Sequence, residues 1–151
     1  MRKIVPFTIV LLIAVLAGAC GATPAPTAVP VAPAGPTALT IQGKVSAELK
    51  LSLDDIKALG VEKLTLEHPK KGATEYEGVR LNKVLDKVTL AGDAAELLLI
   101  ASDGFSATVT LADAKACADC LLAIDGTALS AAMPGMSSKA WVKGVVTIEV
   151  K

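Results

Sequence analysis

The chain has 151 residues, with 15 basic and 15 acidic side chains, and therefore a formal net charge of zero at pH 7. Hydrophobic residues make up 52% of the sequence, but aromatic residues only 3%. Proteins that bind nucleic acids need a basic surface against the phosphates, and stacking of bases or sugars needs aromatic rings. The composition therefore argues against both classes, and the length leaves room for one domain of about 110 residues once the tails are set aside.

Residues 1–19 are predicted to be a signal peptide. Two basic residues precede an almost uninterrupted apolar run over residues 4–17. This run is shorter than the roughly 20 residues that a helix needs to cross a bilayer, and its layout is typical of a secretory signal. The run ends in small residues followed by Cys20, although leucine stands at Leu16 and so one place earlier than in the usual bacterial lipobox.

The segment before Cys20 resembles that lipobox, in which the cysteine is acylated and becomes the mature N-terminus. We therefore expect Cys20 to be the lipid attachment site of an exported protein, anchored to the outer face of a membrane in the bacterial cell envelope. The alternative is an ordinary cleavable signal with an incidental cysteine.

Residues 20–38 are predicted to be the lipidated cysteine and a linker. Positions 21–38 read GATPAPTAVPVAPAGPTA, with five prolines and no charge. Such a segment stays extended at about 3 Å per residue, so it could hold a domain about 50 Å from the membrane. Without residues 1–19 the chain has 13 basic and 15 acidic groups, and Arg80 is its only arginine.

Residues 39–151 are predicted to form the globular domain, in which strands alternate with short helices. Hydrophobic alternation predicts strands over 39–45, 48–53, 61–67, 97–101, 105–110, 121–124 and 141–150. The 97–101 strand is apolar throughout and is expected to be buried on both faces. Val61, Leu64 and Leu66 are expected on the buried face of the 61–67 strand, and residues between 124 and 141 are expected to form a loop.

Capping signals and periodicity predict the helices. Ser52 with Asp55 opens a short helix that Gly60 ends, and Thr110 with Asp113 opens a helix that continues through a pair of cysteines. Apolar residues share one helical face over 81–88. The predicted class is α+β: a mixed β-sandwich or barrel with short helices at its edges.

The order of six segments resembles that of a known family. They read LTIQGKV, LSLDDIKAL, YEGVRLNKVLD, ASDGFSATVTLADA, LLAIDGTAL and WVKGVVTIEV. The chain is similar in this order to the oxidoreductase molybdopterin-binding domain, which has the sulfite oxidase fold. The resemblance implies that fold for residues 39–151 and a molybdenum oxidoreductase as the ancestral activity.

The residues that this activity requires are not all present. The family's enzymes hold molybdenum through the cofactor dithiolene and one protein cysteine, and the alignment places that cysteine within residues 67–71, which read EHPKK. No cysteine occurs between Cys20 and Cys117, and Arg80 is the only arginine of the mature chain to grip an anionic cofactor. We therefore expect no molybdenum catalysis, no catalytic residue and no cofactor, with molybdopterin supported by the resemblance alone.

Three residues are candidates for contacts to such a cofactor. They are His68, Arg80 and Asp103. The simpler interpretation of His68 is an exposed loop residue, and that of Asp103 is a hairpin turn formed with Gly104. His68 is the only histidine, so neither a histidine-based triad nor a multi-histidine metal site can form. Trp141 is expected to fill the core with its indole N–H bonded to a carbonyl.

Cys117 and Cys120 are three residues apart. In an exported protein they most simply form a local disulfide. The alternatives are a redox-active dithiol and half of a metal site, completed by His68 or by Met133 and Met136. No metal site is assigned on this basis.

Two function classes remain. The first is a membrane-tethered binding or interaction module that presents a cleft to a small ligand or to an envelope protein, without nucleic acid as a partner. The second is a redox protein, either a divergent molybdopterin-binding oxidoreductase or a thiol carrier that uses Cys117 and Cys120.

Overall fold

The structure is a computed structural model that describes residue 33 and residues 35–151. The predicted signal peptide, Cys20 and most of the predicted linker lie outside the described residues. None of the helices in the described part has the length and hydrophobicity of a membrane span.

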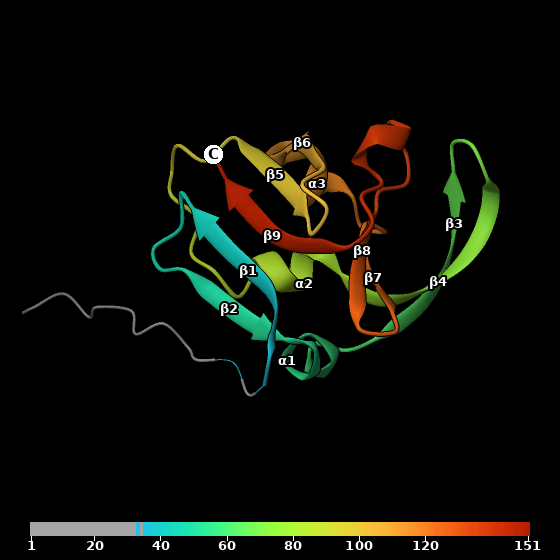
Figure 1. The fold of residues 1–151 in the computed structure, drawn as a ribbon. Coiled ribbons are helices and arrows are strands. Elements are labelled where there is room, and N and C mark those ends of the chain that lie inside the picture. Colours follow the sequence, from blue (N-terminus) through green and yellow to red (C-terminus); the bar gives the residue numbers. More distant parts are fainter. Residues whose placement is uncertain (1–32, 34) are drawn as a thin grey trace, which may run out of the picture.

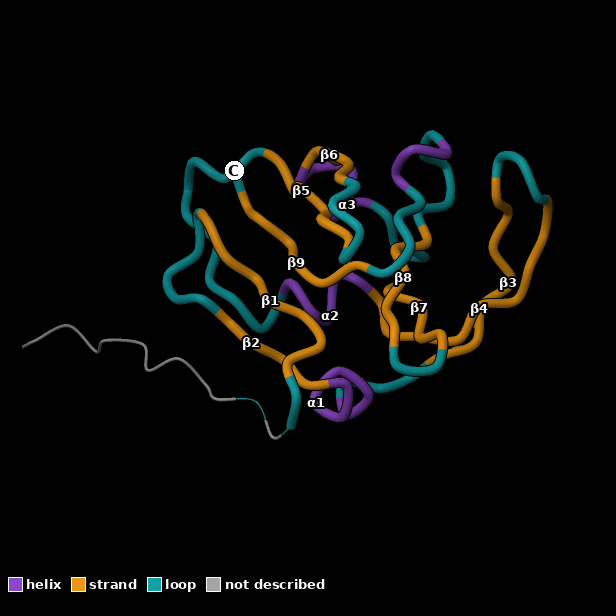
Figure 2. The backbone as a smooth tube through the Cα atoms, viewed as in Figure 1, coloured by secondary structure: helices purple, strands orange, loops and turns teal. Residues whose placement is uncertain are grey.

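Short helices alternate with strands along the described chain (Figures 1 and 2). In chain order the elements are β1 (Thr37–Gly43), β2 (Leu49–Ser52), α1 (Leu53–Ala58), β3 (Glu62–His68), β4 (Gly72–Arg80), α2 (Leu81–Leu85), β5 (Glu96–Ala101), β6 (Ser106–Thr110), α3 (Leu111–Ala116), β7 (Leu121–Asp125), β8 (Ala128–Ala132), the 3-10 helix η1 (Ser138–Ala140) and β9 (Val145–Val150).

The first sheet has the strand order β2-β1-β9-β5-β6. The C-terminal strand β9 lies between β1, to which it is parallel, and β5, to which it is antiparallel. The other pairs in this sheet are antiparallel hairpins. Both ends of the domain therefore join in one sheet, as the neighbouring blue and red strands of Figure 1 show.

The second sheet has the order β3-β4-β7-β8 and is antiparallel throughout. The β3–β4 hairpin extends beyond the rest of this sheet and away from the first one (Figure 1). Side chains alternate between the two faces of a strand, and one face of the second sheet packs into the main core through Val79, Leu122, Leu129 and Ala131. The opposite face carries a smaller apolar cluster of Leu66, Leu121, Ala123 and Ala132.

The predicted caps of α1 and α3 are present. The Ser52 hydroxyl accepts the Asp55 backbone N–H at 3.2 Å, and the Asp55 carboxylate accepts the Ser52 backbone N–H at 2.9 Å. The Thr110 hydroxyl accepts the Asp113 N–H at 3.1 Å. The bonds are reciprocal at α1 and one-way at α3, and they satisfy backbone donors that have no partner in the first helical turn. The α+β architecture with short helices is therefore confirmed.

Several boundaries differ from the sequence prediction. Strand β8 lies where a loop was expected, because the alanine-rich sequence ALSAA has little β-propensity of its own and forms a strand by pairing with β7 across the turn at Gly126. Helix α3 ends at Ala116, so the cysteines follow it instead of lying within it.

Two burial predictions were wrong. Leu97, Leu99 and Ala101 of β5 are buried, but the residues between them are only half-buried, so the second face of this strand remains partly accessible. Val61 is 38% exposed, because it precedes β3, which begins at Glu62. Counting by twos from the buried Leu66 also places Val61 out of phase with the buried face of that strand.

At Gly78 the backbones of β4 and β7 approach each other closely. A Cβ atom built on Gly78 would lie 2.6 Å from the Cα atom of Ala123 and would overlap the carbonyl oxygen of Leu122. These are backbone atoms that cannot move aside without breaking the pairing of β4 with β7. Glycine at this position therefore permits the second sheet to form.

We expect Gly78→Ala to lower the free energy of unfolding by about 1–3 kcal/mol, because the added methyl group forces β4 away from β7. Gly92→Ala is a matched control, since its Cβ would meet no atom within 4 Å, and we expect a change within about 0.5 kcal/mol. Urea denaturation of both variants measures the effect. Equal stabilities of the two variants would contradict the close-approach explanation.

Candidate functional site

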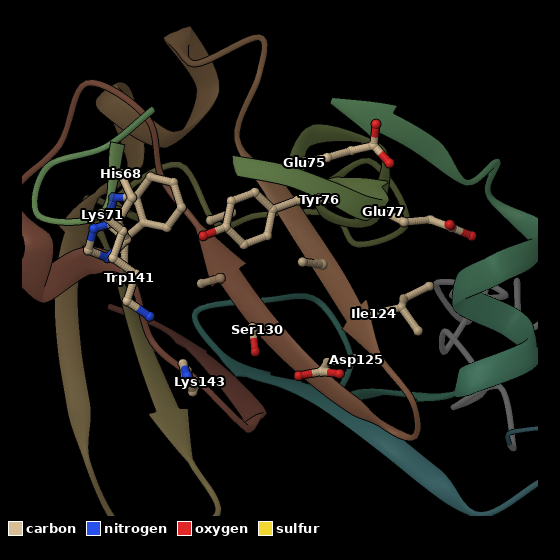
Figure 3. Close-up of a pocket in the computed structure, with 13 residues that line it drawn as sticks. His68, Lys71, Glu75, Tyr76, Glu77, Ile124, Asp125, Ser130, Trp141 and Lys143 are labelled. Atoms are coloured by element: carbon tan, nitrogen blue, oxygen red, sulfur yellow. The ribbon is translucent and has the colours of Figure 1, made fainter. Parts of the chain in front are cut away.

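A pocket of about 320 Å³ lies on the face of the second sheet that points away from the main core. Strand register explains which side chains reach it. Ala123 lies opposite Gly78 on one side and Ser130 on the other, and Tyr76 is two residues from Gly78, so all of them share this face. The pocket is lined by His68, Lys71, Glu75, Tyr76, Glu77, Ala123, Ile124, Asp125, Ser130, Ala131, Ala132, Trp141 and Lys143 (Figure 3).

Trp141 closes one side of the pocket. It follows η1, and the next residue, Val142, is buried and accepts the backbone N–H of Ala131 at 2.7 Å. This bond holds the segment against β8. The indole lies 4.6 Å from the His68 ring and 5.6 Å from the Tyr76 ring between centroids, with interplanar angles of 59° and 53°.

Trp141 packs against the core as expected, but the expected hydrogen bond of its indole N–H is not formed within the described residues. Its side chain is half-buried and packs against both the main core and the small cluster of the second sheet. Its Nε1 atom is covered by protein but has no hydrogen-bond partner among the described residues.

His68 is half-buried in the pocket instead of exposed in a loop. It is the last residue of β3 and pairs with Gly72, so the hairpin turn comprises only the three residues after it. Its Nδ1 atom accepts the backbone N–H of Lys70 at 3.0 Å. This bond orients the ring toward Trp141.

The charges around the pocket differ in how they are paired. Glu75 and Glu77 lie at its border, and each faces the Lys63 ammonium, at 3.9 and 3.3 Å. Lys71 and Lys143 form no ion pair with any described residue, and neither does Asp125 at the end of β7. The unpaired charges that line the pocket are therefore two positive and one negative.

Arg80 is engaged outside the pocket. Its Nε donates to the Glu62 carboxylate at 2.8 Å, and its Nη1 donates to the Ala118 carbonyl and to the Asp119 carboxylate. Glu62 also accepts from the Lys83 ammonium at 2.7 Å. The bonds from Lys83 and Arg80 hold the pKa of Glu62 below its usual range, and Glu62 raises the pKa of Arg80.

Asp103 lies in the β5–β6 turn and accepts the backbone N–H of Phe105 at 2.9 Å, which is turn chemistry. It is not among the residues that line the pocket. Of the three candidate cofactor contacts, the structure therefore brings only His68 to the pocket, and places Arg80 and Asp103 elsewhere.

Cys117 and Cys120 form a disulfide, with their Cα atoms 5.4 Å apart, so the predicted bond is confirmed. Cys120 is fully buried, and its carbonyl accepts the Leu81 N–H at 2.8 Å. Cys117 is half-buried beside an open hollow of about 560 Å³ between α3 and the loop before η1.

Tyr76 and the alanine floor of the pocket were not anticipated from the sequence. The signal for Tyr76 was its spacing of two residues from Gly78, which puts both on one strand face. That signal could be used only with the register of β4 against β7. Ser130 and Ala132 could not be identified as pocket residues, because they lie on β8, where the sequence predicted a loop.

The donors do not suit the molybdenum cofactor that the family resemblance implies. The aligned segment 67–71 forms the tip of the β3–β4 hairpin and offers no thiolate, and both described cysteines are in the disulfide. The guanidinium of Arg80 is already bound to two carboxylates. Within the described residues no group of three or more His, Cys, Asp or Glu side chains is placed to hold a metal ion.

Comparison with known proteins supports the fold. No family model matches the chain, and no curated protein matches it in sequence. It is similar to the crystal structure of the sulfane dehydrogenase SoxCD from Paracoccus pantotrophus, with a TM-score of 0.63 and 16% identity, over 74% of this chain and 37% of that chain. The chain thus spans little more than a third of that protein chain. At this identity the similarity shows the fold alone, and the sulfite oxidase-like fold expected from the sequence is confirmed.

Proposed function

We propose that this domain is a non-catalytic binding module that holds a small organic ligand in the pocket between the second sheet and Trp141. The lipid at Cys20 and the proline-rich linker tether it to the outer face of a membrane in the cell envelope. In the other form of this proposal, the binding module presents the same cleft to an envelope protein instead of a small ligand.

One observation carries this proposal. The chain has one tryptophan and one tyrosine, and the fold brings Trp141 and Tyr76 together at one pocket, with His68 against the indole. Ala123 and Ala132 beneath them leave space that larger side chains would fill. Ligand pockets typically combine such an apolar wall with a few polar groups, which Ser130 and Asp125 provide here.

The donor chemistry supports binding over molybdenum catalysis. The aligned segment 67–71 contains no cysteine, Arg80 is the only arginine after residue 2, and His68 already uses Nδ1 in its own turn. The dehydrogenase that shares the fold is only 16% identical, so its activity is not transferred. A divergent molybdopterin-binding oxidoreductase remains the alternative that the shared fold suggests.

A thiol carrier is the second candidate function, because the two cysteines lie close enough to form a disulfide. Cys117 is half-buried and lines an open hollow. However, thiols that react readily sit near positive charge, such as a helix N-terminus, whereas Cys117 is the C-cap of α3. A helix C-terminus carries a partial negative charge that disfavours a thiolate. The position therefore supports a structural bond more than a redox one.

The binding module predicts that single-ring compounds change the emission of Trp141, the only tryptophan. We expect at least one of benzoate, benzylamine and benzyl alcohol to change it saturably. Ser130→Leu should weaken that binding at least tenfold, because the leucine fills the pocket from β8. Ala73→Leu, on an exposed position of β4 outside the pocket, is the control and should bind as the wild type does. No change with any of the three compounds would overturn the proposal.

The membrane tether predicts a lipid on Cys20. In a bacterial host the full chain should sediment with membranes, and mass spectrometry should find acylated Cys20 as the mature N-terminus. Cys20→Ser should release the protein from the membrane, whereas the double variant Cys117→Ser, Cys120→Ser should stay bound. An unmodified Cys20, or cleavage at another position, would refute the anchor.

A structural disulfide predicts resistance to reduction. Because Cys120 is fully buried, we expect a reduction potential below about −300 mV, which is typical of structural bonds in secreted proteins. Equilibration with dithiol buffers of known potential measures it. A value near −200 mV would favour the thiol carrier, and stoichiometric molybdenum and pterin in the purified protein would favour the oxidoreductase.

A further inference from the structure

The charges that line the pocket are distributed unevenly. Lys143 is two residues beyond Trp141, and Lys71 belongs to the turn that follows His68, whose ring contacts that indole. Figure 3 shows both lysines on the side of the pocket where Trp141 and His68 lie, and Asp125 farther along the sheet. The aromatic end is therefore positive and the other end is negative.

The acidic residues near this end do not cancel the lysine charges. Glu75 and Glu77 are each within 4.0 Å of the Lys63 ammonium. Lys63 pairs with Glu77, and Thr65, two residues farther along β3, pairs with Glu75. The three charged side chains therefore lie on the face of the hairpin opposite to that of Tyr76. Lys71 and Lys143 form no ion pair within the described residues, and two such ammonium groups beside an apolar wall attract an anion.

The size and lining of the pocket limit what that anion can be. A volume of about 320 Å³ is at the lower end of the range for small-molecule sites. The alanine side chains of the floor are small enough for a flat ring to lie against them and against Tyr76. The lining contains no arginine, the residue suited to bidentate phosphate binding. Lysine ammonium groups can instead bind a carboxylate as point charges.

From these features, and resting on the proposed binding function, we infer that the pocket takes a small aromatic carboxylate: one flat ring whose acid group lies between Lys71 and Lys143. Ser130 pairs with Lys143 and so lies beside the acid end, whereas Asp125 lies farther along the sheet, toward the opposite end of the ring. The Asp125 carboxylate forms no hydrogen bond with other described residues, and it can accept one from a hydroxyl group of the ligand. A 4-hydroxybenzoate has this arrangement of acid, ring and donor.

The test compares four ring compounds that differ in charge and donors: 4-hydroxybenzoate, benzoate, benzamide and benzylamine. Trp141 fluorescence of the full chain reports binding of each. We expect the two carboxylates to bind at least tenfold more tightly than benzamide and benzylamine, with 4-hydroxybenzoate the tighter. Added salt should weaken the binding of the carboxylates, because partly exposed charge pairs are screened.

Charge-removing variants locate the acid group. Lys71→Gln and Lys143→Gln should each weaken benzoate binding about five- to tenfold, because each removes one charge-assisted contact, and should leave benzamide binding unchanged. Lys70→Gln is the matched control, since Lys70 is adjacent to Lys71 but does not line the pocket. We expect it to bind benzoate like the wild type.

The outcomes separate this inference from the function on which it rests. Tighter binding of benzylamine or benzamide than of benzoate overturns the carboxylate class and leaves the binding module standing. Benzoate binding that neither lysine variant weakens overturns the placement of the acid group. If none of the four compounds binds, both the inference and the binding module fail.

Discussion

The pairing of β4 with β7 at Gly78 is the constraint on which the pocket depends. At this point the two backbones approach too closely for any side chain. That contact joins the projecting β3–β4 hairpin to the strands that pack on the main core. It also sets the register, because Gly78 opposite Ala123 places Tyr76 on the outward face above a floor of small residues. The same pairing therefore stabilises the second sheet and builds the pocket.

The charged groups around this sheet divide into those that hold the fold together and those that form no ion pair within residues 35–151. Arg80 binds Glu62 of β3 and the 117–120 turn, so the only arginine of the globular domain ties the sheet to the segment closed by the disulfide. Lys83 adds to the same network through Glu62. An arginine used in this way is not available to grip an anionic cofactor. Lys71 and Lys143, in contrast, border the pocket without a counter-ion among the described residues.

The fold of this domain is similar to that of a dehydrogenase, but the side chains at its pocket do not suit a molybdenum cofactor. The sheets are similar in arrangement to those of a sulfane dehydrogenase chain, while segment 67–71 at the tip of the β3–β4 hairpin contains no cysteine. His68 accepts a hydrogen bond from its own turn, and its ring lies tilted against that of Trp141. These two contacts hold the imidazole at the aromatic wall of the pocket.

Local sequence determined the features that depend on neighbouring residues alone. The capping residues Ser52 and Thr110, the Asp103–Gly104 turn and the disulfide spacing were readable because each bond spans only two or three residues. Strand β8 and the pocket were decided by tertiary structure. The alanine-rich 128–132 segment becomes a strand only against β7, and Trp141 meets Tyr76 and His68 only after residues more than 60 positions apart are packed together. Periodicity shows which residues can share a face, but the register between distant strands decides which faces meet.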